Sequence, residues 1–144
     1  MADIVIKGKH MHGMGGANRA IKRQKKEFVK RGLPNSELLF NGTININTSA
    51  FKYKVLKYDY YFKDVVHKRF PRKRVEDFGF IKIEALIHNG ITYRNWGYLY
   101  FPQSSPHKTK SDFFELIGKK LEGFSHFDEI EIIVKEGMLE VLPG

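Results

Sequence analysis

Apolar and polar residues alternate along most of this chain, which predicts a protein built mainly of β-strands. The clearest example ends at Asn47, where Ile44 and Ile46 alternate with Thr43 and Asn45. Because successive side chains of a strand point to opposite faces, we expect the two isoleucines to face the core. The threonine and the two asparagines then share the opposite face.

Similar alternation predicts strands in most of the rest of the chain. The predicted strands cover residues 3–9, 38–47, 51–62, 78–87, 91–101, 129–134 and 138–142. Asn89-Gly90 has the composition of a tight hairpin turn, and Glu136-Gly137 separates the last two strands. Residues 63–77 are predicted to be a charged connection, because Pro71 lacks the N–H group that a central strand needs.

A first helix is predicted from Ala17 to Gly32. Ile21, Phe28 and Val29 have helical spacing and would form its apolar face. Glycine is a typical residue just after the C-terminus of a helix. The rest of the helix surface is strongly basic.

A second helix is predicted to begin at Ser111 or Asp112 and to end at Gly123. Asp112 and Glu115 have the three-residue spacing of a capping box. The apolar face of this helix would consist of Phe114, Ile117 and Leu121. Many strands with two α-helices predict a small, single-domain, mainly β protein whose sheet closes into a β-barrel, since closure removes exposed strand edges.

The amino-acid composition limits the number of domains and the kinds of site that the chain can form. The 144 residues suit one domain, and 42% of them are hydrophobic, which is enough for a core. The absence of cysteine excludes disulfides, a thiol nucleophile and cysteine-ligated zinc. No apolar run approaches the roughly 20 residues that a membrane span needs, and the run at residues 4–6 is too short for a signal sequence. We therefore expect a cytoplasmic protein without a membrane partner.

The chain is strongly basic, with a formal net charge of +9 and a pI of about 9.7. Such a charge attracts polyanions such as nucleotides and nucleic acids. Seven Lys and Arg residues lie within residues 19–31, and five lie within residues 67–74. A solvated basic surface without a partner is the alternative for both segments.

A glycine-rich stretch precedes the first predicted helix. Gly13, Met14, Gly15 and Gly16 lead into Ala17. Backbone N–H groups in such a turn can face a phosphate, and the positive end of the helix dipole adds to the attraction. A plain strand-to-helix turn is the alternative.

Thr43 and Asn45 offer a hydroxyl and an amide oxygen on one face of a strand. Hard oxygen ligands of this kind suit Mg²⁺, which binds few protein groups and keeps phosphates and water as its other ligands. From these residues alone, a polar strand that faces water remains open.

The order of these features resembles the archaeal-type, CTP-dependent riboflavin kinases, a family of small cradle-loop β-barrels. The resemblance extends from about Ile4 to Val134. In that family a glycine-rich run follows the first strand, as His12-Gly13-Met14-Gly15-Gly16-Ala17 does here. Gly42-Thr43-Ile44-Asn45 is similar to the Gly-Thr-Leu-Asn hallmark of the family.

Further segments follow in the same order as in the family. They are Phe78-Gly79, Asn89-Gly90, the loop Pro102-Gln103-Ser104-Ser105-Pro106-His107, the predicted helical segment Phe114-Glu115-Leu116-Ile117-Gly118 and Phe127-Asp128-Glu129-Ile130. Ala17 stands where the family has a third glycine, and Ser104 and Ser105 stand where its loop has arginine and threonine. These departures concern substrate binding more than the fold.

The resemblance implies a riboflavin-kinase-like barrel that transfers the γ-phosphoryl group of CTP, or of another nucleoside triphosphate, to the 5′-hydroxyl of riboflavin, giving FMN and CDP. It implies a Mg²⁺ site at Thr43 and Asn45. It also implies nucleotide binding by Gly13, Met14, Gly15, Gly16 and Ala17, and flavin binding by Ser105, His107 and Glu115. Glu115 would in addition orient or deprotonate the acceptor hydroxyl, whereas the residues alone suggest a helix cap at this position.

A second hypothesis is a non-catalytic barrel homologue that binds nucleic acid through the basic helix 19–31 and the connection 67–74. Aromatic residues that could stack on bases accompany these segments, although a barrel core explains most of them as well. They are Phe51, Tyr53, Tyr58, Tyr60, Tyr61, Phe62 and Phe70. Conversion of riboflavin to FMN would support the kinase, and strongly salt-dependent binding of RNA or DNA would support the second hypothesis.

Overall fold

The computed structural model describes residues 3–11, 17–39, 43–48, 51–69, 72–103, 113–119, 121 and 128–143. Within these residues the chain forms nine β-strands, one α-helix and one short 3-10 helix. In chain order they are β1 (Ile4–Met11), α1 (Ala17–Lys30), η1 (Ser36–Leu38), β2 (Ile44–Asn47), β3 (Phe51–Val55), β4 (Tyr60–Arg69), β5 (Arg72–His88), β6 (Ile91–Pro102), β7 (Phe113–Gly118), β8 (Glu129–Val134) and β9 (Leu139–Pro143).

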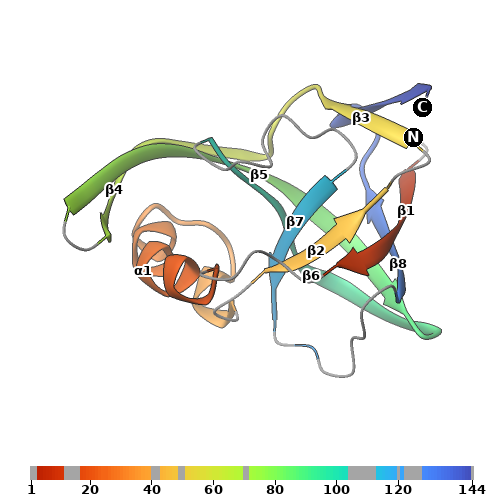
Figure 1. Ribbon diagram of the computed structural model, residues 1–144, viewed down its shortest axis with the longest axis horizontal. Coiled ribbons are helices and arrows are strands. Elements are labelled where there is room, and N and C mark those ends of the chain that lie inside the picture. Colours follow the sequence, from red (N-terminus) through yellow and green to blue (C-terminus); the bar gives the residue numbers. More distant parts are fainter. Residues whose placement is uncertain are drawn as a thin grey trace.

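Six of the strands close into an antiparallel barrel in the order β1, β2, β7, β6, β5 and β8 (Figure 1). The ring closes where Leu86 of β5 pairs with Ile132 of β8. β4 pairs with the first half of β5, and β3 pairs with β9 in a separate two-stranded sheet. The mainly β barrel that the sequence predicts is therefore confirmed.

Aliphatic side chains that alternate along the strands fill the barrel interior. Ile46, which was predicted to face the core, has no exposed surface, and Ile44 packs against the same cluster. The cluster also includes Ile6, Ile83, Leu99, Leu116, Ile130 and Ile132. Asn45, between the two isoleucines, is therefore on the outer face of β2, as the alternation predicts.

Helix α1 packs against the outside of the barrel, beside the curved β4–β5 pair (Figure 1). Phe28 is fully buried there, with its ring centroid 5.2 Å from that of Phe78 and 5.0 Å from that of Phe80. Val29, which was predicted to share its face, is 45% exposed, so that part of the prediction was wrong. In the part of the chain that the structure describes, no helix is long and apolar enough to cross a membrane.

The end of α1 is a Schellman motif. Gly32 has φ +81°, the Leu33 N–H donates to the Phe28 carbonyl at 3.0 Å, and the Gly32 N–H donates to the Val29 carbonyl at 3.1 Å. Because glycine adopts positive φ without steric cost, the helix can end at Lys30 with its last carbonyls satisfied. The predicted stop at Gly32 is confirmed.

Residues 63–77 form most of a β-hairpin, so the predicted charged connection was wrong. β4 and β5 remain paired as far as Arg69 and Arg72, and Lys68 pairs with Lys73. Pro71 lies between the two strands and outside the described residues.

The second predicted helix was also wrong where the structure describes it. Residues 113–118 form β7, which pairs with β2 on one edge and with β6 on the other. Leu116 packs in the barrel interior, whereas Ile117 packs under α1 on the outside. Pairing on both edges satisfies the backbone of this segment, and that outweighs the local capping signal of Asp112 and Glu115. Asp112 and Gly123 lie outside the described residues.

Two predicted strands are shorter than expected, and one predicted turn is confirmed. Of the described residues within 38–47, those of β2 form a strand and those before it do not, and within residues 51–62 the chain divides into β3 and the start of β4. Asn89 and Gly90 have φ of +50° and +76°, as both central residues of a type I′ hairpin turn do. This turn joins β5 to β6, and β6 agrees with the predicted strand 91–101.

Candidate functional site

Asn45, Glu115 and Tyr100 form a row across three neighbouring strands. Asn45 of β2 pairs with Glu115 of β7, which pairs in turn with Tyr100 of β6. Directly opposite residues on antiparallel strands have Cβ atoms about 4.5–5.5 Å apart. The row is on the outer face, because the adjacent Ile46 and Leu116 pack in the barrel interior. Three polar groups from distant segments thus lie side by side on the barrel wall.

The first strand, β1, ends beside this row. Met11, the last residue of β1, pairs with Asn45, and α1 begins at Ala17. The sequence between them contains the predicted phosphate-binding residues, which are outside the described part of the chain: Gly13, Met14, Gly15 and Gly16. β1 therefore ends beside Asn45, and only five residues separate it from the N-terminus of α1, the kind of position at which proteins bind phosphate.

Thr43 lies just before β2, close to Asn45. The Thr43 hydroxyl donates to Asn45 Oδ1 at 3.5 Å, and Asn45 is only 4% exposed. Hydroxyl and amide oxygens of this kind suit Mg²⁺, whose remaining ligands would be phosphate and water. Among the residues that the structure describes, no group of three or more His, Asp or Glu side chains is placed to hold a metal ion.

Tyr100 connects the row to α1. Its hydroxyl donates to Oε1 of Gln24, and the two residues are 5% and 3% exposed. Burial raises the pKa of Tyr100 well above its usual range, and the carboxylates of Glu115 and Glu76 raise this pKa further. The phenol therefore stays protonated at neutral pH.

Comparison with known proteins does not assign the chain to a family. No protein-family model matches the chain, and no curated protein sequence matches it at a significant level.

The structure brings together three predicted site residues, Thr43, Asn45 and Glu115. Ala17 is the first residue of α1, where the glycine-rich run was expected to end. The other predicted residues lie outside the described residues; they are Gly13, Met14, Gly15, Gly16, Ser105 and His107. Glu115 is on a strand, so its interpretation as a helix cap was wrong.

Sequence reasoning missed Tyr100 and Gln24. The alternation of Tyr100 with the buried Leu99 could have placed the tyrosine on the outer face of its strand. Gln24 is an uncharged residue with two basic residues on each side, which is a signal of a buried position in a basic helix. No local signal indicates that these two residues meet, because their contact joins a helix to a distant strand.

A pocket of about 370 Å³ lies farther along the outer face of β6. Its lining includes Tyr60, Trp96 and Tyr98 together with Lys82 and Lys119. The Tyr98 hydroxyl donates to the Pro34 carbonyl at 2.7 Å, which holds the segment after α1 against the strand. No residue of the row lines this pocket, so it is separate from the candidate site.

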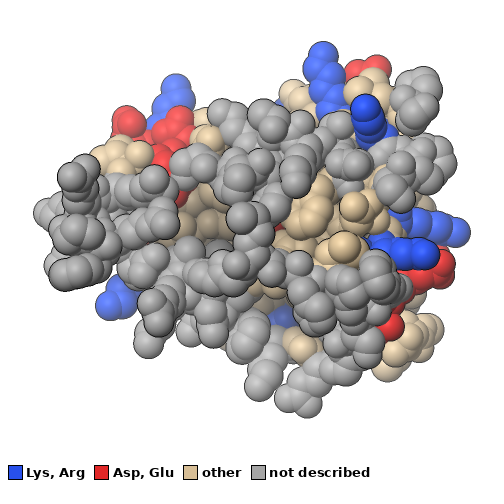
Figure 2. Space-filling model, in the orientation of Figure 1, with Lys and Arg blue, Asp and Glu red and all other residues tan. Residues whose placement is uncertain are grey.

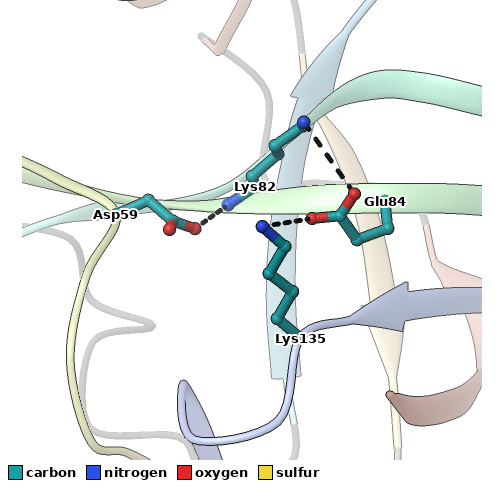
Figure 3. Close-up of polar contacts among 4 residues, drawn as sticks. All are labelled: Asp59, Lys82, Glu84 and Lys135. Carbon is teal, nitrogen blue, oxygen red and sulfur yellow. Dashed lines mark hydrogen bonds and ion pairs between the residues drawn. The ribbon is translucent and has the colours of Figure 1, made fainter. Parts of the chain in front are cut away.

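Lys82, the β5 lysine that lines this pocket, lies in a network of charged residues (Figure 3). Glu84 lies between two ammonium groups, with one oxygen 3.8 Å from Lys82 Nζ and the other 3.8 Å from Lys135 Nζ. The backbone N–H of Lys82 donates to Asp59 Oδ2 at 2.7 Å. Glu84 therefore offsets part of the positive charge of Lys82, whereas none of the described residues that line the pocket itself is acidic.

Proposed function

We propose that this protein is a Mg²⁺-dependent phosphotransferase that moves the γ-phosphoryl group of CTP, or of another nucleoside triphosphate, to the 5′-hydroxyl of riboflavin. The observation that carries the proposal is the pairing of Asn45 with Glu115 on one side and with Met11 on the other. This pairing supports a single site that contains Asn45 as a Mg²⁺ ligand, Glu115 as a carboxylate and the start of the glycine-rich segment. Phosphoryl transfer needs little more than positioning and charge compensation, which such a set can supply.

On the donor side, backbone N–H groups of residues 13–17 would bind the phosphates. Thr43 Oγ1 and Asn45 Oδ1 would hold Mg²⁺, which when bound neutralises negative charge on the phosphate oxygens. Both side chains are neutral, so the triphosphate supplies the charge that retains the ion.

On the acceptor side, the Glu115 carboxylate would accept the proton of the riboflavin 5′-hydroxyl. The 5′-oxygen then bonds to the γ-phosphorus while the bond from that phosphorus to the β–γ bridging oxygen breaks, and CDP leaves. Tyr100, which pairs with Glu115 and donates its hydroxyl hydrogen to Gln24, would support the position of this strand against α1. Ser105 and His107 would line the flavin.

Incubation of the purified protein with riboflavin, MgCl₂ and each common ribonucleoside triphosphate tests the proposal directly. We expect FMN and nucleoside diphosphate in equal amounts, with CTP as the preferred donor. Chelation of the metal with EDTA should stop the reaction. Absence of FMN with every triphosphate, from protein whose circular dichroism shows it to be folded, would overturn the proposal.

A further inference from the structure

The β4–β5 pair continues beyond the barrel as a two-stranded arm (Figure 1). β6 pairs with β5 only from Phe78 onward, so within the described residues the stretch 72–77 pairs with β4 alone. At about 3.3 Å per residue this stretch extends the arm by about 20 Å. We refer to residues 67–69 and 72–74, at the far end of the arm, as the basic tip.

The net charge of the protein is concentrated in two segments. Residues 67–74 carry a net charge of +5 and α1 carries a net charge of +5, so the rest of the chain is close to neutral. On the face in Figure 2 the described Lys and Arg side chains are scattered, and several lie next to Asp or Glu. The protein is therefore not uniformly basic, and its excess charge belongs to the arm and to the helix beside it.

The register of the hairpin places basic residues opposite one another. Lys68 pairs with Lys73, and Arg69 pairs with Arg72. Like charges directly opposite on two strands destabilise a hairpin. A polyanion bound to the basic tip would remove this repulsion.

Hydrogen bonds join the base of the arm to the end of α1. The Arg31 guanidinium donates to the backbone carbonyls of Lys63 and Asp64. The Asp64 N–H and the Tyr61 hydroxyl donate to the two carboxylate oxygens of Asp77, at 2.9 and 3.0 Å. These contacts set the direction in which the arm leaves the barrel and hold the basic helix next to it.

An exposed apolar pair lies directly below the basic tip. Val66 of β4 pairs with Val75 of β5, and the two residues are 45% and 59% exposed. A ligand that lies along the arm would cover this pair as well as the charged residues. The arm thus offers both charge and apolar contact along its length.

We infer that the basic tip binds double-stranded DNA by lying in the major groove and contacting the phosphates on both sides. A two-stranded β-ribbon fits this groove, which is about 12 Å wide in B-form DNA. Each strand of the ribbon would then face one phosphate backbone, and the opposed basic residues would be neutralised together. The inference does not rest on the proposed phosphotransferase, because no residue of the Asn45–Glu115–Tyr100 row lies in the arm.

An anionic membrane offers similar charge but fits the arm less well. Membrane-surface segments combine basic residues with large apolar side chains such as Trp, Phe and Leu on one face. Beyond Asp64, the exposed apolar side chains that the structure describes on the arm are those of Val66 and Val75. Binding measurements with anionic vesicles distinguish a membrane from DNA as the ligand.

The test compares two variants with the same net charge. In the tip variant, threonine, which suits a strand, replaces Lys68, Arg69, Arg72 and Lys73. In the control variant, threonine replaces four exposed lysines outside the arm, Lys9, Lys52, Lys54 and Lys57. Fluorescence anisotropy with a labelled duplex of about 20 base pairs measures affinity between about 50 and 200 mM salt. A third variant, Lys68→Arg with Lys73→Arg, keeps the charge of the tip.

We expect the wild type, the control variant and the arginine variant to bind the duplex. The tip variant should lose at least about 10-fold in affinity, and its slope of log K against log salt should be smaller by about 3.6, or about 0.9 for each lost phosphate contact. Equal loss in the tip and control variants would show that only total charge matters and would overturn the inference. So would equal tip-dependent affinity for single-stranded RNA, or tip-dependent binding to phosphatidylserine vesicles without binding to DNA. FMN formation by the tip variant is measured separately and should be unchanged.

Discussion

Asn45 of β2 lies directly opposite Glu115 of β7 on the outer wall of the barrel. The two residues come from segments far apart in the chain, and neither segment alone contains both the amide and the carboxylate. Met11 is the other neighbour of Asn45, so the glycine-rich segment starts beside the same pair. This relationship makes Asn45 and Glu115 the most informative positions for testing function.

Removal of either proposed metal ligand, Thr43 or Asn45, should nearly abolish the proposed activity. We expect Thr43→Ala and Asn45→Ala each to lower kcat for FMN formation by about 100-fold or more, as loss of one transition-state-stabilising group does. Initial rates of FMN formation, separated by liquid chromatography, measure the effect. Thr92→Ala removes an exposed hydroxyl from β6 and should leave the rate unchanged. Wild-type rates in the first two variants would contradict the metal role.

Glu115→Gln should lower kcat by about 100-fold or more and leave KM for CTP unchanged, because the amide cannot accept the hydroxyl proton. The same variant should lower the pKa of Tyr100, since the Glu115 carboxylate contributes to raising it. That pKa should stay above its usual range, because burial is the larger cause. NMR of ring-labelled tyrosine across a pH titration measures it, and an unchanged pKa would mean that the two side chains do not interact.

The buried tyrosines of β6 predict a loss of stability at high pH. Burial raises the pKa of Tyr98 to about 12, and that of Tyr100 lies well above its usual range. Both phenols titrate near pH 10 in the unfolded chain, so above that pH the folded state retains protons that the unfolded state releases. The free energy of unfolding should therefore fall by about 1.4 kcal/mol per pH unit for each group until the pH passes its folded pKa. Urea unfolding between about pH 9 and 11 should show a shallower fall for Tyr98→Phe than for the wild type, and equal slopes would contradict this account.

Truncation of Phe28 and truncation of its neighbour Val29 should lower the free energy of unfolding by very different amounts. Phe28 is fully buried between α1 and the barrel, so Phe28→Ala should lower the free energy of unfolding by about 3–5 kcal/mol. Val29 is 45% exposed, so Val29→Ala should change it by less than about 0.5 kcal/mol. Urea unfolding followed by circular dichroism measures both values. Similar losses in the two variants would mean that α1 does not pack as described.

Gly97 allows β6 and β7 to approach closely near the row. A Cβ atom at this position would overlap with the Ile117 carbonyl oxygen and lie 2.6 Å from the Gly118 Cα. Gly97→Ala should therefore push the two strands apart, lower the free energy of unfolding by about 1–3 kcal/mol and slow FMN formation. Gly90→Ala, at a turn with open space around it, should cost about 1 kcal/mol through its positive φ and leave the rate unchanged. A normal rate in Gly97→Ala would show that the close approach of β6 and β7 is not needed for activity.

Features with a local cause could be predicted from the sequence. The turn at Asn89 and Gly90 and the helix end at Gly32 need positive φ, which these residue types adopt at low cost. The alternation around Ile46 identified the buried face of β2 correctly, because burial on one face requires a period of two.

Predictions that depended on distant partners were wrong. Asp112 and Glu115 have the spacing of a helix cap, yet the segment that follows pairs with β2 and β6 as a strand. Pro71 suggested a break in strand structure across residues 63–77, yet the strands on each side of it pair with each other. In both places hydrogen bonds to other strands satisfied the backbone and outweighed a short local signal.

The sequence by itself determined that Thr43 and Asn45 share a face and that Ile46 lies behind them, because side-chain direction in a strand depends only on position along it. The tertiary structure alone decided that Glu115 and Tyr100 complete the row and that the glycine-rich segment starts next to it. These neighbours depend on the register of four strands, and a shift of one residue in any of them would turn its polar side chains into the core. Burial of the apolar face inside a closed barrel therefore selects the register, and the register assembles the candidate site.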